Sequence, residues 1–119
     1  MKNVKDQVYA ALTAQFENVS DLYPKDWTEL PAIQFQEEDN RSYERTTAGE
    51  CKSYVRYLVN IWDTKNTSEA ALQVDEIMSE LGLVRTACQD VPDPSGMKHK
   101  SMRYEAIIDL ESDTAYWPQ

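Results

Sequence analysis

The chain has 119 residues, of which 41% are hydrophobic and 28% charged, so it is long enough to bury a core and is predicted to form a single domain over 1–119. Its 21 acidic and 12 basic residues give a net charge of −9, which argues against general nucleic-acid binding, because such binding needs Lys and Arg to neutralise phosphates. No apolar stretch approaches the ~20 residues that a membrane span requires, and the N-terminus has no signal-peptide pattern. We therefore expect a cytoplasmic protein that does not contact a membrane. Cys51 and Cys88 are predicted to be buried thiols that form neither a disulfide nor a zinc site.

The first half of the chain begins with apolar residues at helical spacing, which predict an amphipathic helix over 3–17. Two prolines in 18–31 predict an irregular connection, because proline lacks the amide hydrogen that a helix needs. A short strand is expected at 32–37. The polar segment 37–50 is either a long loop or contains a mobile second strand around 42–46, and we expect it to become ordered on binding.

The clearest strand covers 51–63, where apolar and polar residues alternate. The next element is a helix over 66–81. Asn66 followed by Glu69 is typical of a capped helix start, and Gly82 suits a left-handed stop.

Two more strands are predicted at 83–91 and 100–110. The order is helix, two or three strands, helix, two strands. This order predicts an α+β fold, a two-layer sandwich with a mainly antiparallel sheet of four to five strands and two helices on one face.

No combination of residues indicates catalysis. His99 is the only histidine, and it has no neighbouring cluster of metal ligands. The carboxylates at 37–39 and those around Asp75 are expected to be solvated rather than gathered in a cleft. We therefore expect no enzymatic activity, no cofactor and no metal.

A basic segment stands out in this acidic chain. Asp93–Gly96 matches a type I turn, and Lys98, Lys100 and Arg103 follow it. The positive charges predict a contact surface that docks head-to-tail on an acidic patch of a second copy, at 37–39 or on the helix face near Asp75. A solvated hairpin is the alternative. The predicted interface comprises Asp93, Pro94, Ser95, Gly96, Lys98, His99, Lys100, Arg103, Glu37, Glu38, Asp39, Tyr43 and Trp117.

Five stretches together resemble small tail-completion or tail-terminator (head–tail joining) proteins of long-tailed phages and prophages of Gram-positive bacteria. They read VYAAL, YPKDWTELPAIQF, KSYVRYLVNIWD, TSEAALQVDEIMSELGL and PDPSGMKHKSMRYEAIID. The similarity extends over nearly the whole chain. The resemblance implies an α/β sandwich that forms a ring, commonly a hexamer, on the end of the tail tube. It implies no catalytic or binding residues.

Under this resemblance the partners are other copies of the chain, the tail-tube protein and the head-completion or connector protein. The protein would be assembled in the host cytoplasm, from a monomer or a preformed ring, and would lie in the virion at the head–tail junction. DNA would pass through the ring without specific binding, and we expect acidic side chains to line the lumen. Reversing Lys98, Lys100 and Arg103 to Glu is expected to leave the monomer folded and abolish assembly.

Three other functions compete with this one. The first is a general protein-interaction module with no enzymatic activity. The second is a small hydrolase or nucleotide-binding enzyme that uses the carboxylates. The third is a nucleic-acid binder that uses the basic hairpin.

Overall fold

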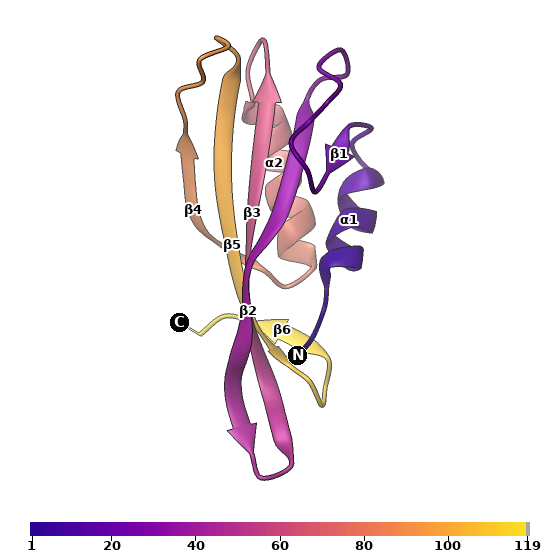
Figure 1. Cartoon of the computed structure of the whole chain (residues 1–119), viewed down its shortest axis with the longest axis vertical. Coiled ribbons are helices and arrows are strands. Elements are labelled where there is room, and N and C mark those ends of the chain that lie inside the picture. Colours follow the sequence, from indigo (N-terminus) through magenta and orange to yellow (C-terminus); the bar gives the residue numbers. More distant parts are fainter. Residues whose placement is uncertain (119) are drawn as a thin grey trace.

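The computed structural model describes residues 1–118 and has an α+β fold with two helices and a six-stranded, mostly antiparallel sheet (Figure 1). The predicted α+β class is therefore confirmed. The sheet has six strands rather than the predicted four to five. The elements are α1 (Lys5–Thr13), β1 (Val19–Ser20), β2 (Ala32–Thr46), β3 (Gly49–Asp63), α2 (Ser68–Glu80), β4 (Val84–Asp90), β5 (Lys98–Asp109) and β6 (Thr114–Tyr116).

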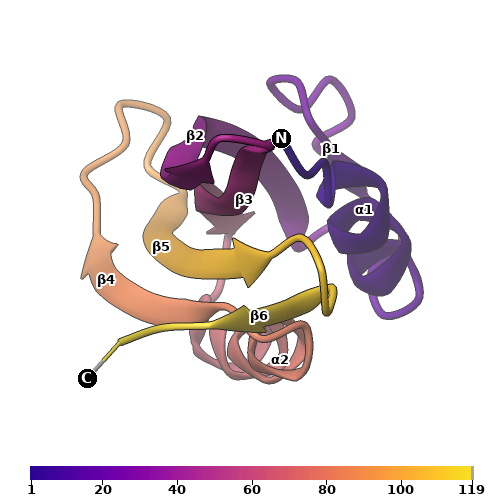
Figure 2. The ribbon, with the colours of Figure 1, turned by 90° about the horizontal axis from the view of Figure 1, so that it is seen from below.

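The strands follow the order β1-β2-β3-β5-β4, and β6 pairs with the end of β5. All pairs are antiparallel except β1 with β2. Strand β3 lies in the middle of the sheet and pairs with β5 along twelve residues, from Lys52 to Asp63. Viewed from its end, the sheet curls rather than lying flat (Figure 2). A curled sheet is the normal result of the right-handed twist of each strand.

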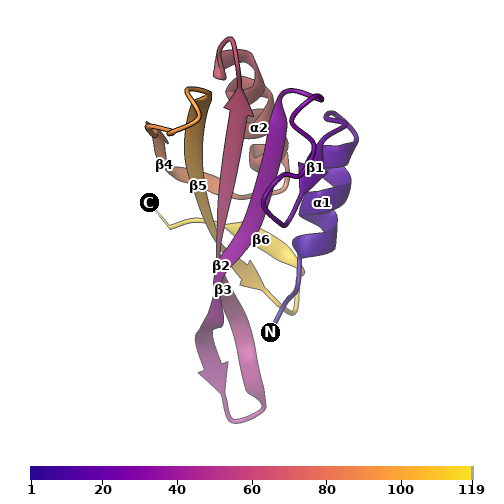
Figure 3. The same cartoon turned by 45° about the horizontal axis from the view of Figure 1, so that its top comes forward.

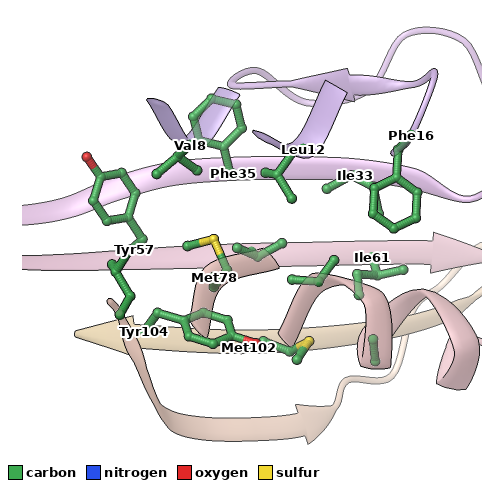
Figure 4. Close-up of a cluster of buried hydrophobic side chains, with 14 of the residues drawn as sticks. Val8, Leu12, Phe16, Ile33, Phe35, Tyr57, Ile61, Met78, Met102 and Tyr104 are labelled. Atoms are coloured by element: carbon green, nitrogen blue, oxygen red, sulfur yellow. The ribbon is translucent and has the colours of Figure 1, made fainter. Parts of the chain in front are cut away.

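One buried cluster joins both helices to one side of the sheet (Figure 4). Alternation along β3 places Tyr57, Val59 and Ile61 on this side, and all three are fully buried. Helix α1 contributes Val8 and Leu12 to the cluster. Burial of apolar side chains at roughly 25 cal/mol per Å² makes this cluster the main source of stability.

Both helices differ from the predicted bounds. Helix α1 is shorter than 3–17, because Gln15 N already bonds to Leu12 O in a tighter turn at 3.1 Å. Helix α2 begins after Thr67, whose side chain makes no capping bond; Asn66 instead accepts a hydrogen bond from Ser68 N at 3.2 Å. The predicted stop is confirmed, since Gly82 has φ +87°.

The strand predictions need two corrections. The strand predicted at 32–37 continues to Thr46, so the polar segment 37–50 forms the second half of β2, with the strand predicted at 42–46, and the start of β3. The connection 18–31 is not wholly irregular, because Val19 and Ser20 pair with β2 in parallel. Within residues 1–118, no helix is both long and apolar enough to cross a membrane.

Candidate functional site

The hairpin tip at residues 41–51, hereafter the arm, projects from the body of the molecule (Figure 1). All eight residues of 41–48 are exposed. The molecule measures 52 × 25 × 22 Å and has a radius of gyration of 15.3 Å. A compact domain of this length would have a radius of gyration of about 13.5 Å. The arm therefore makes the protein elongated.

Polar contacts, rather than a core, surround the base of the arm. The guanidinium of Arg41 lies 4.5 Å from the ring centre of Tyr54, and its Nη1 lies 3.5 Å from Asp39 Oδ2. On the other strand, Cys51 Sγ donates to Glu44 O at 3.3 Å. Exposed pairs of this kind contribute ~0–1 kcal/mol each. The arm is therefore held mainly by the backbone ladder that continues from the body.

Tyr43 is the exposed aromatic residue of the arm, and 54% of its surface is accessible. It lies at a bulge, because Ser42 pairs with Ser53 while Glu44 pairs with Lys52. A bulge redirects the side chain of the extra residue. The sequence prediction included Tyr43 but not its arm neighbours. The β-branched and aromatic residues of 42–47 were the signal for a strand there.

The predicted turn at Asp93–Gly96 is present: Gly96 N donates to Asp93 O at 3.0 Å, and Gly96 has φ +81°. The Asp93 carboxylate is fully engaged. Its Oδ1 accepts from Ser95 N at 2.9 Å, and its Oδ2 accepts from Trp62 Nε1 at 2.9 Å. Hydrogen bonds from Ser95 and then Trp62 hold the pKa of Asp93 below its ordinary value. The turn is thus fixed to the sheet, and sequence reasoning missed the role of Trp62.

The basic side chains after this turn have different environments. Lys98 is exposed and forms no ion pair within 1–118, whereas Lys100 Nζ lies 3.0 Å from Asp90 Oδ1. The ring of His99 stacks on Trp62 at 4.4 Å, and its Nε2 bonds to Asn60 Oδ1 at 2.9 Å. Burial lowers the pKa of His99. These contacts show that the His99 side chain packs against neighbouring residues of the sheet.

Arg103 does not belong to the exposed turn; it lies mid-strand in β5 beside Glu38. Its Nε and Nη2 donate to Glu38 Oε1 and Oε2 at 2.7 and 3.0 Å. Arg56 Nε donates to the same Oε1 at 3.1 Å. Only 16% of the Glu38 side chain is accessible. Two predicted contact residues of opposite charge are therefore paired within one chain.

The Glu38 pair predicts a pH dependence of stability. Hydrogen bonds from Arg103 lower the pKa of Glu38 from its ordinary value of 4.5. A lowered folded-state pKa contributes stability above pH 4.5, and this contribution is lost as the pH falls through the folded-state pKa. In urea unfolding, the free-energy difference between wild type and Glu38→Gln should be largest at pH 7 and shrink toward pH ~3. A difference that stays constant over this range would contradict the assignment.

The remaining predicted residues lie in separate places. Glu37 Oε1 accepts from the buried Tyr57 hydroxyl at 2.9 Å, and burial together with Glu37 raises the pKa of Tyr57. Asp39 pairs with Arg41 as described above. The ring of Trp117 lies 6.0 Å from that of Tyr54.

The predicted surface is therefore not one patch. The basic turn and the arm lie at opposite ends of the long axis (Figures 1 and 3), whereas the Glu38 pair joins the middle of β2 to the middle of β5. The second acidic site also has partners within the chain, since Asp75 accepts from the Tyr104 hydroxyl at 2.9 Å and pairs with Arg85 at 3.3 Å. Of the predicted contact residues, Lys98 and Tyr43 remain exposed, and Lys98 forms no ion pair within residues 1–118.

No group of three or more His, Cys, Asp or Glu in residues 1–118 could hold a metal ion. Cys51 and Cys88 are free thiols, as predicted, but the predicted burial is wrong, because Cys51 is half-buried and Cys88 is exposed.

Comparison with known proteins assigns no family: no family model matches the chain, and no curated protein matches it. The geometry of the arm and of the basic turn must therefore support any functional proposal.

Proposed function

We propose that the protein is a structural subunit of a phage or prophage tail. Copies of the chain form a ring that caps the tail tube and joins it to the head connector. The arm is the observation that carries this proposal, because eight consecutive residues, 41–48, are exposed and form no core of their own. The resemblance noted in the sequence points to the same class of protein.

The exposed arm favours a contact with a neighbouring subunit. A two-stranded hairpin without a covered face is marginally stable in water. An arm that lies against a neighbouring subunit gains buried surface on binding and loses little entropy, because β2 and β3 already order it. When the contacting surfaces on the two copies differ, repetition of the contact forms a closed ring if the rotation between copies closes, and an open filament if it does not.

The proposed subunit is a two-layer sandwich with both helices on one face of the sheet. The net charge of −9 per copy suits a channel through which DNA slides, because an acidic wall releases no counterions to passing phosphates. The partners are then the tail-tube protein and the head-completion or connector protein. The assembled protein would lie at the head–tail junction of the virion.

Electron microscopy of tails made with and without the protein tests this proposal. Without it, tubes of uncontrolled length that fail to join heads are expected. Tails of normal length and complete particles in its absence would contradict the proposal. If the purified protein still formed oligomers in that case, the general interaction module would be the better explanation.

A further inference from the structure

An apolar groove of about 270 Å³ opens between α1 and α2 at the end where β5 meets β6. Its floor reaches the core, since both Val8 and Leu83 line it and are buried. The apolar part of the lining includes Val4, Val8, Val55, Leu81, Leu83 and Ala115. A cavity of about 150 Å³ with apolar walls already binds a benzene ring. The groove is therefore large enough for one aromatic side chain.

The polar residues that line this groove make it acidic. Glu80 and Asp113 contribute carboxylates, and Gln7 is the third polar residue. Asp113 pairs with Lys2 at 2.8 Å, whereas Glu80 forms no ion pair with any residue of 1–118. A ligand that fits this groove would place an aromatic ring inside the groove and a positive charge near Glu80.

The arm offers both groups two residues apart. Tyr43 is aromatic and exposed, and Arg45 is also exposed and forms no ion pair in the described chain. The arm of the same molecule points away from the helices (Figures 1 and 3), so these groups would come from a second copy. Buried aromatic and arginine side chains are the usual anchors of protein interfaces.

We propose that the groove between α1 and α2 binds Tyr43 from the arm of a second copy, with Arg45 of that copy beside Glu80. The contact is head-to-tail, because each copy offers its arm to one neighbour and its groove to another. This contact rests on the proposed function, because a ring requires neighbouring copies to touch. The arm of one copy and the groove of the next are the surfaces that touch.

Photo-cross-linking identifies the site directly. A benzophenone amino acid placed at position 43 of the full chain is irradiated in concentrated solution and in purified tails, and the cross-linked peptides are sequenced. Cross-links to residues 4–8 or 80–83 of another copy are expected. Cross-links that map to any other surface, or a chain that remains uncross-linked in both samples, would overturn the proposal.

Substitutions test the chemistry of the contact. Tyr43→Ala should raise the concentration for half-assembly at least about tenfold, whereas Tyr43→Phe should retain assembly. Arg45→Glu and Glu80→Arg should each weaken assembly, and combining them should restore it. Glu76→Arg is the matched control, since Glu76 is exposed on the same helix and does not line the groove. Failure of the double variant to recover would overturn the pairing of Arg45 with Glu80.

The two proposals can fail separately. Cross-links in the groove together with normal tails in the absence of the protein would support the contact and contradict the tail function. Tails that need the protein but give cross-links elsewhere would support the function and contradict the groove.

Discussion

Replacing residues 43–52 with Asn-Gly is expected to abolish assembly while the body stays folded. Ser42 and Ser53 are partners in the β2–β3 ladder, so a two-residue turn can close the shortened hairpin between them. The segment removed includes the exposed residues 43–48 and leaves the core cluster unchanged. We expect the melting temperature to change by less than about 5 °C, which corresponds to roughly 1 kcal/mol for a domain of this size.

Circular dichroism melting checks the fold of the shortened protein, and sedimentation velocity or electron microscopy of tails checks its assembly. A shortened variant that assembles as wild type does would remove the main support for the proposed function. If it unfolded instead, Tyr43→Ala would separate the two effects, because it keeps the whole hairpin.

Arg103→Glu is expected to destabilise the monomer itself by about 1–2 kcal/mol. It would replace two charge-assisted hydrogen bonds to Glu38 with two facing carboxylates, although water screens the pair in part because 40% of the Arg103 side chain is accessible. Lys98→Glu should leave stability unchanged within about 0.5 kcal/mol, because Lys98 is exposed. The structure therefore alters the expectation that reversing all three basic residues would leave the monomer folded.

Urea unfolding of the two single variants measures this contrast, and an assembly assay of Lys98→Glu alone tests whether the basic turn contacts a partner. Lost assembly in a folded Lys98→Glu protein would support the turn as a contact surface. Equal stability of the two variants would show that the Glu38 pair contributes little.

The regular elements could be predicted from the sequence because one face of each is buried. Alternation along 51–63 matches β3 closely, since its inward residues face the core. Helix α2 was predicted for the same reason: Val74 and Met78 recur at helical spacing and are fully buried. Where burial selects the residue type, the pattern in the sequence follows the structure.

The arm and the Glu38 pair could not be predicted in this way. Both faces of residues 41–48 meet water, so no alternation marks them as a strand. Glu38 lies at a register irregularity between Glu37 and Asp39, and its two partners come from two other strands, β3 and β5. Such contacts between distant residues leave no local pattern.

The length of the arm limits which surfaces it can touch. The outgoing strand of the arm covers 41–46, and these six residues at about 3.4 Å each span about 20 Å. The two shorter dimensions of the molecule are 25 and 22 Å. Because β2 runs from Ala32 to Thr46 as one strand, its bulges bend the path without interrupting it. The tip can thus reach most of the way across one adjacent molecule, and a binding partner beyond that neighbour is out of reach.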